Sequence, residues 1–492
     1  MHKYAKSIQI QNKNCSERNL NMIELKLDFY SQPIHISDED VSKFENPIIF
    51  YLVNKQDKTP FYVSFVIINF NNKEMKVLSS YNENNIRIIN EQEEIEKYTL
   101  RRTPHSTISL HKDEDFFTFM DEEEYFFYVN YKDLIMKVYT IEDLLIDTKV
   151  KFKCFSSTFF RDDSDPNYFF FSIVDEQDIL HIYRSPLKLD EFIEFDTFQS
   201  QPSPPHTLRK YKNSLFLSLD FKNAGYLLQN KGKILDMNGL NNLIYRNIAK
   251  LMYSRYGIAN PEKLSIRLLQ YKHYQELVDI IKNGYKIKCL PGEILQINTQ
   301  TKEKTYYSTS GSNPAHFEID VEDDCIYTSS HNFFFNEDGQ FYIEPAVIDK
   351  FKLVDSKLEH LGAFKYSKGY RYSSHKVFRY EGKPYICTIG QPNRLIFADA
   401  TTMELLFYHD IGEDVLSDQT DFSSYLTYYG SMETDIVGFQ VSPNGESIII
   451  IGPDKIYFYS FPERKIYNEI DLKSSEMLKQ CTARTLHVDY LD

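Results

Sequence analysis

The stretch that decides the fold is "DIVGFQVSPNGESIIIIGPDKIYFYSFPERKIYNEIDL", residues 435–472. Two turn signals divide it, Pro443-Asn444-Gly445 and Pro453-Asp454, because proline presets one turn dihedral and glycine accepts a positive one. The segments between the turns are rich in isoleucine, tyrosine and phenylalanine, which favour pleated, half-buried surfaces. After a first strand, the further predicted strands are 448–451, 455–461 and 465–472. Four antiparallel strands in about 40 residues are typical of one β-propeller blade.

The same unit recurs along the chain. Each copy combines an apolar strand, a turn rich in Asp, Asn, Gly or Lys, and further strands, and self-similarity of this kind indicates a repeat architecture. The units begin near Phe61, His105, Phe155, His206, His316, His375 and Ile436. We therefore expect an all-β fold, a seven-bladed β-propeller that forms a single domain over residues 1–492.

One segment has a different character. Residues 238–286 carry apolar side chains at helical spacing on both sides of an Asn260-Pro261 break. This segment accounts for the long interval between the fourth and fifth units. We therefore expect a two-helix insertion between those blades.

The chain ends provide a way to close the ring. The tail, 481–492, is expected to pair with strand-like segments at 21–30 and 46–54. Such pairing hides sheet edges that would otherwise invite aggregation.

Composition and charge exclude several classes of protein. The 492-residue chain has 56 Lys and Arg residues against 71 Asp and Glu residues, a formal net charge of −15 and no basic run, which disfavours nucleic acid and anionic membranes as partners. The N-terminus lacks a basic segment followed by an apolar core, and no stretch of about 18 apolar residues follows it.

Six cysteines lie far apart without a Cys-x-x-Cys pair, which favours isolated thiols over a disulfide framework or a zinc ribbon. We expect a soluble cytoplasmic protein.

Four of the units share a histidine in the same register. The aligned segments are "PHSTISLHKDEDFFTFM" from Pro104, "PHTLRKYKNSLFLSLDF" from Pro205, "AHFEIDVEDDCIYTSSH" from Ala315 and "SHKVFRYEGKPYICTIG" from Ser374. In each, the histidine opens a strand, a turn follows, and a second apolar strand begins after the turn. As the innermost strands of four blades, these segments would present their imidazoles around the central channel.

Converging neutral imidazoles are the donors that a borderline metal requires. A rigid ring of blades holds such ligands without a flexible loop. The predicted cofactor is a divalent transition metal, Fe(II) first, with Cu or Zn as alternatives, and its candidate ligands are His105, His206, His316 and His375. Metal-bound imidazoles need partners that orient their rings, and Glu318, two residues beyond His316 on the same strand face, is the best-placed acid.

A second repeat position is polar in several units. His331 follows the second strand of its unit, and its counterparts are Asp220 and Gln391. Polar groups at one repeat position can line a substrate-facing rim, where loops carry function. His331, Glu318 and Asp220 are therefore the candidate catalytic residues. The alternative is that such positions hold turn residues that satisfy local backbone groups.

Two resemblances bear on these patterns. Through "VSPNGESIIIIGPDKIYFYSF" the last unit resembles WD40-like and YVTN-like blades of the β-propeller superfamily, although the chain has no tryptophan and hence no Trp-Asp signature. That resemblance implies the fold and no activity.

In architecture alone the chain is similar to the carotenoid cleavage oxygenases, seven-bladed propellers with a four-histidine iron, whose surrounding motifs are missing here. In WD40-like blades, by contrast, a histidine braces the blade by hydrogen-bonding a Ser and an Asp, and Ser218 and Asp220 follow His206 in this way.

These observations favour one function and leave two alternatives. The favoured function is a soluble enzyme with a histidine-bound metal on the channel axis, which acts on a small apolar substrate by oxidative chemistry, with a Lewis-acid rearrangement or cyclisation as a variant. The first alternative is a non-catalytic propeller that binds a protein or peptide on its top face. The second is a metal-free enzyme that uses the same histidines as general acid and base. Hydrolase and nucleotide-binding functions are disfavoured, because Gly-x-Ser-x-Gly, Gly-x-x-x-x-Gly-Lys and His-Glu-x-x-His motifs are absent from the sequence.

Overall fold

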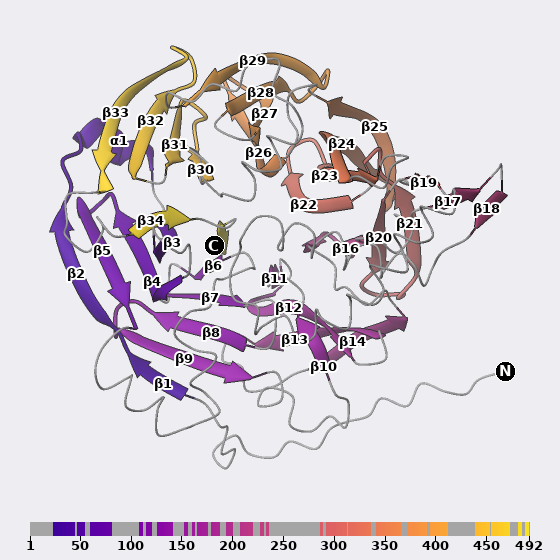
Figure 1. Cartoon of the computed structure of the whole chain (residues 1–492), viewed down its shortest axis with the longest axis horizontal. Helices are drawn as coiled ribbons and strands as arrows, with labels where there is room; N and C mark the ends of the chain where they lie inside the picture. The colour runs from indigo at the N-terminus through magenta and orange to yellow at the C-terminus, as the bar shows by residue number, and fades with distance from the viewer. Residues whose placement is uncertain are drawn as a thin grey trace.

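Seven sheets stand around one central axis, and this arrangement is a seven-bladed β-propeller (Figure 1). The predicted all-β fold class is therefore confirmed. The computed structural model describes residues 23–44, 47–54, 60–80, 108–111, 115–120, 125–140, 152–155, 160–162, 165–175, 179–186, 193–199, 207–219, 227–230, 233–235, 286–288, 292–311, 313–335, 341–365, 372–390, 394–411, 438–452, 454–472, 481–484 and 488–491.

Blades 1 and 2 contain strands from both chain ends, and blade 3 follows them in the chain. Blade 1 consists of β2 (Asp28–Pro33), β5 (Glu74–Ser79), β4 (Pro60–Asn69), β3 (Ile48–Asn54) and β34 (Cys481–Arg484). Blade 2 consists of β1 (Ile23–Lys26), β9 (Ile135–Thr140), β8 (Tyr125–Asn130), β7 (Phe116–Met120), β6 (Ile108–His111) and β35 (Val488–Leu491). Blade 3 consists of β14 (Ile193–Gln199), β13 (Ile179–Pro186) and β12 (Asp165–Asp175), with β10 (Phe152–Phe155) and β11 (Phe160–Asp162) both paired to β12.

The other four blades each have four strands, named here from the rim to the axis. Blade 4 consists of β21 (Lys304–Ser308), β20 (Glu293–Asn298), β16 (Ser214–Leu219) and β15 (Leu208–Tyr211). Blade 5 consists of β25 (Lys357–Lys365), β24 (Phe341–Val354), β23 (Cys325–Phe335) and β22 (Asn313–Asp320). Blade 6 consists of β29 (Glu404–Asp410), β28 (Arg394–Asp399), β27 (Lys383–Gly390) and β26 (Tyr372–Tyr380). Blade 7 consists of β33 (Lys465–Asp471), β32 (Lys455–Ser460), β31 (Ser447–Ile451) and β30 (Gly438–Val441).

Both chain ends contribute to ring closure. The C-terminal strand β34 pairs antiparallel with β3, which confirms the expected pairing of the tail with 46–54. The last strand, β35, instead pairs in parallel with β6 of blade 2. The N-terminal strands β1 and β2 pair with β9 and β5 at the outer edges of their blades, so segment 21–30 does not meet the tail as expected. The N-terminal strands β1 and β2 thus lie at the rim of the ring, and the C-terminal strands β34 and β35 lie near its axis (Figure 1).

The predicted insertion interrupts blade 4. Its residues, 238–286, lie outside the described residues except for Lys286, so its helical character stays a prediction. Its position differs from the expectation, because β16 pairs directly with β20 in one sheet. The chain therefore leaves blade 4 halfway and returns to it, rather than leaving between two blades. The flanking strands β17 (Leu227–Asn230), β18 (Lys233–Leu235) and β19 (Lys286–Lys288) form a small separate sheet at the outside of the ring (Figure 1).

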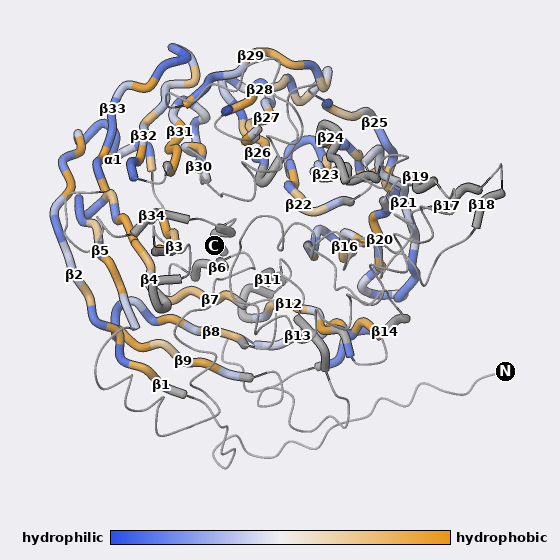
Figure 2. The backbone as a smooth tube through the Cα atoms, in the orientation of Figure 1, coloured by the Kyte–Doolittle hydropathy of each residue, from blue (hydrophilic) through white to orange (hydrophobic). Residues whose placement is uncertain are grey.

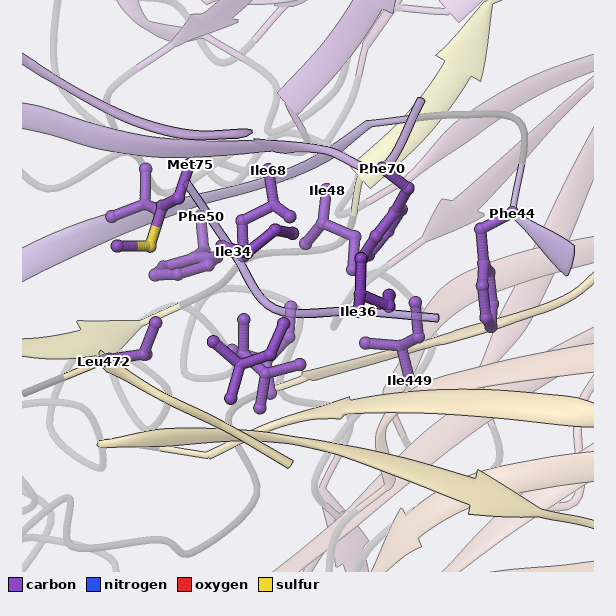
Figure 3. Packing of buried hydrophobic residues seen from close by; sticks show 14 of the residues in the cluster. Ile34, Ile36, Phe44, Ile48, Phe50, Ile68, Phe70, Met75, Ile449 and Leu472 are labelled. Carbon is purple, nitrogen blue, oxygen red and sulfur yellow. The ribbon is translucent and has the colours of Figure 1, made fainter. Parts of the chain in front are cut away.

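Apolar side chains from neighbouring blades meet in the seams between them. Figure 3 shows the seam between blades 1 and 7, where Phe44 and Phe70 lie with Ile449 of β31. The helix α1 (Asp38–Lys43), capped by the Ser37 hydroxyl, leads into Phe44 and covers this seam from outside. Burying each such side chain contributes about 1.5–3 kcal/mol, so the seams hold the blades together. Hydropathy also changes from the inside of a blade to its rim. In blade 7 the inner strand β31 is mainly hydrophobic, and the outermost strand β33 is mainly hydrophilic (Figure 2).

Candidate functional site

Two of the four predicted ligands lie on neighbouring blades. His316 is on β22 and His375 is on β26, the strands of blades 5 and 6 that lie next to the axis. His105 and His206 lie outside the described residues. Neither described histidine opens its strand as expected, since β22 begins at Asn313 and β26 begins at Tyr372.

A β-bulge immediately precedes each of the two histidines. The β22–β23 ladder shifts register between Pro314 and His316, and the β26–β27 ladder shifts between Tyr372 and His375. A bulge re-aims the side chain that follows it and increases the local twist, and bulges are over-represented beside active sites. The two blades therefore use the same local device at the same repeat position.

Two ion pairs join β22 to β26. Lys376 Nζ lies 3.1 Å from both carboxylate oxygens of Glu318. Further along both strands, Arg379 donates to the two oxygens of Asp320 at 2.9 and 3.1 Å. Both strands advance in the same direction between these contacts. The two strands therefore run side by side at the level of these contacts.

Both imidazoles belong to faces that meet in one seam. His316 is paired with Ser329, which lies on the same face of blade 5 as Tyr327. The Tyr327 hydroxyl donates to the Ala400 carbonyl of blade 6 at 3.3 Å, so this face looks toward blade 6. His375 is paired with Thr388 on the face of blade 6 that packs against Tyr327. We call the region formed by His316, Ser329, His375 and Thr388 the 5–6 seam.

His375 contacts the neighbouring blade directly. Its side chain is buried, and its Nε2 lies 3.4 Å from the Tyr327 carbonyl oxygen. Because a carbonyl only accepts, Nε2 carries the proton in this contact. The imidazole thereby links blade 6 to the second strand of blade 5 through a backbone carbonyl, which differs from the Ser and Asp brace of WD40-like blades.

The serine brace of the preceding blade acts on the backbone. Ser218 Oγ accepts from Thr207 N at 2.8 Å, and its single proton is shared between the Thr207 carbonyl at 3.3 Å and the Ala315 carbonyl of blade 5 at 3.4 Å. Ala315 directly precedes His316, so this contact ties blade 4 to the strand that carries the histidine. Asp220, the other predicted brace and a candidate catalytic residue, lies outside the described residues.

The remaining candidate residues have other surroundings than expected. Glu318 was expected to orient an imidazole, but its carboxylate is paired with Lys376. His331 is on β23, paired with Asn313, and its side chain lies outside the described part of the structure. Within the described residues, no group of three or more His, Cys, Asp or Glu side chains is placed to hold a metal ion.

Sequence reasoning missed two polar clusters outside the 5–6 seam. His181 of blade 3 lies between two acids, with Nε2 at 3.0 Å from Asp175 and Nδ1 at 2.8 Å from Glu194. His360 of blade 5 lies 2.8 Å from the fully buried Asp349, and this hydrogen bond raises the pKa of His360 above its ordinary value. The partners come from different strands, so no local motif marks either cluster. The first cluster spans β12, β13 and β14 of blade 3, and the second joins β24 to β25, the outermost strand of blade 5.

Comparison with known proteins finds distant structural likeness only. No protein-family model matches the chain, and no curated protein matches it. The apocarotenoid oxygenase of Synechocystis is similar with a TM-score of 0.46 and 9% identity, covering 97% of this chain and 96% of that chain. The dihydro-heme d1 dehydrogenase NirN is similar with a TM-score of 0.42 and 7% identity, covering 87% and 74% of the two chains. Sqt1 of Saccharomyces cerevisiae is similar with a TM-score of 0.41 and 8% identity, covering 76% and 77%.

The class of protein is thus a seven-bladed β-propeller, and these comparisons carry no argument about its ligand. Within the described residues, no helix has the length and apolar character needed to cross a bilayer.

Proposed function

We propose that this propeller is an enzyme whose metal ion is held by imidazoles at the axis end of the 5–6 seam. One observation supports this most strongly: His316 and His375, from two neighbouring blades, each follow a bulge on the strand next to the axis and belong to faces that meet in one seam. His105 and His206, at the same repeat position of two other units, would complete the ligand set.

The chemistry of these donors fits a borderline metal. Fe(II), Cu and Zn all accept neutral imidazole nitrogen. The tautomer of His375 that donates from Nε2 to the Tyr327 carbonyl has its lone pair on Nδ1, and a second hydrogen bond of this kind orients metal-bound histidines. The Ser218 contact to Ala315 and the ion pair of Lys376 with Glu318 would hold the strand of His316 rigid.

The proposed reaction is oxidation of a small apolar molecule. A bound metal with an open position would supply activation of O₂ or polarisation of the substrate. The chain's own residues would keep the imidazoles neutral, fix their rings and exclude bulk water, since the 5–6 seam is lined by the apolar cluster around Tyr327 and Ile348.

Elemental analysis of tag-free protein tests the metal directly. We expect about one equivalent of Fe, Cu or Zn per chain in the wild type. The double variant His316→Ala/His375→Ala is expected to lose it, whereas the exposed His35→Ala is the matched control and should retain it. Absence of metal from wild-type protein, even after anaerobic reconstitution, would refute the proposal, as would equal metal content in all three proteins.

The second candidate is a non-catalytic propeller in which the histidines only brace the blades. The contact of His375 with the Tyr327 carbonyl favours it, because this hydrogen bond joins two blades without any ligand. Such a propeller would bind a protein or peptide on its surface. If this second candidate is right, wild-type protein contains no metal, and replacing His375 lowers its free energy of unfolding.

A further inference from the structure

The 5–6 seam contains a buried hydroxyl without a partner. Ser329 is 0% exposed, and its Oγ makes no hydrogen bond to any described residue. A buried polar group is nearly always hydrogen-bonded in native proteins, because leaving it unsatisfied costs free energy. The unpaired hydroxyl at a candidate site can therefore bind a partner that is not among the described residues.

The hydroxyl lies opposite His316, on the face of blade 5 that looks toward blade 6. Ser329 is directly opposite His316 in the β22–β23 ladder, where paired Cβ atoms are about 4.5–5.5 Å apart. It is two residues beyond Tyr327, so its side chain is on the face that looks toward blade 6. The Tyr327 carbonyl also receives the Nε2 contact of His375. Ser329 is thus opposite His316 and two residues from the carbonyl that His375 contacts.

We propose that Ser329 positions a small exogenous ligand beside His316 and His375 by hydrogen-bonding to it through Oγ. This inference rests on the proposed metal-binding function and adds to it the residue that holds the non-protein ligand. A serine hydroxyl both donates and accepts, and its short side chain leaves room for a ligand of a few atoms. The class of ligand is therefore a small oxygen- or nitrogen-containing molecule or anion.

The test uses full-length protein loaded with Co(II), with azide as the probe. Azide binding is followed by the visible ligand-field spectrum of the cobalt. Ser329→Ala is expected to bind one Co(II) as the wild type does, but to bind azide about 10-fold more weakly, as the loss of one hydrogen bond to a charged ligand implies. The matched control is Ser172→Ala in blade 3, a serine that is equally buried and also lacks a partner in the described structure. It should bind azide as the wild type does.

Thermal unfolding of the metal-free proteins separates the proposed role from a purely structural one. If Ser329 has no structural partner, removing its hydroxyl leaves stability equal or higher, so both metal-free Ala variants should unfold at or above the wild-type temperature. A large loss of stability confined to Ser329→Ala would overturn the inference. Equal azide affinity in Ser329→Ala and wild type, or no azide spectrum in the cobalt-loaded wild type, would also overturn it while leaving the metal proposal intact. Failure of the wild type to bind cobalt is seen before azide is added, and it would overturn the proposed function together with this inference.

Discussion

Buried charged side chains of this propeller are matched across strands. Asp349 is fully buried, and its carboxylate accepts from Ser310 N at 3.0 and 3.1 Å and from His360 Nε2 at 2.8 Å. Asp175, also buried, accepts from Ile179 N at 2.8 Å beside its contact with His181. Removing these donors would leave a buried carboxylate without its partners, which is unfavourable, so the contacts constrain the sequence at these positions.

Two histidines should show opposite pH dependence. Hydrogen bonding to Asp349 raises the pKa of His360, whereas burial lowers the pKa of His409. The stabilisation by His360 is complete below its unfolded pKa and is lost as pH rises through its higher folded pKa. For His409 the pKa is lower in the folded state, so the unfolded state binds the proton more tightly. Protonation of His409 therefore destabilises the fold at low pH, and this destabilisation disappears as pH rises above the unfolded pKa.

Urea unfolding at about pH 5.5 and about pH 8.5 measures both effects. The stability lost in His360→Gln should be larger at the lower pH. The stability lost in His409→Gln should be larger at the higher pH. The same pH trend in the two variants would contradict this assignment.

At the scale of elements, one turn shows why blade 7 carries glycine at a fixed position. Gly445 has φ +74°, and a Cβ there would lie 2.1 Å from the Arg379 carbonyl oxygen of blade 6. Gly382 has nearly the same φ, +75°, but nothing within 4 Å of an added Cβ. The two glycines therefore separate the cost of the backbone conformation from the cost of a clash between blades.

Alanine substitution at these glycines gives a matched pair. Gly382→Ala should cost about 1–2 kcal/mol of unfolding free energy, the penalty of a left-handed conformation. Gly445→Ala should cost about 1–3 kcal/mol more, because the turn must also move away from Arg379. Chemical unfolding measures both values. Equal losses would mean that the contact between blades 6 and 7 adapts without cost.

Turn chemistry also explains which elements the sequence predicted well. In blade 7 the predicted strands 448–451, 455–461 and 465–472 match β31, β32 and β33 within a residue at each end, because proline and glycine mark the turns. The histidine strands were placed less well. A bulge shifts the register just before His316 and His375, and a bulge has no sequence signal of its own here, so both strands begin three residues before their histidines.

At the scale of the whole molecule, the repeat predicted the number of blades but not the contacts between them. Glu318 was assigned to an imidazole because it lies on the same strand as His316, yet its partner, Lys376, comes from the next blade. Local spacing contains no information about such tertiary pairs. The interruption of blade 4 was misplaced for a similar reason, because only the pairing of β16 with β20 shows that the chain returns to the same sheet.

Ring closure by the C-terminal strands can be tested by truncation. A chain ending at residue 480 lacks β34 and β35, which exposes the edges of β3 and β6 near the axis. Exposed edges pair with other chains, so this variant should self-associate and unfold at a temperature lower by on the order of 5 °C. A chain ending at residue 487 retains β34 and exposes only β6, so its loss should be smaller. Size-exclusion chromatography and thermal unfolding measure both effects. If the chain ending at residue 480 elutes and unfolds as the full-length chain does, the rim strands β1 and β2 alone close the ring.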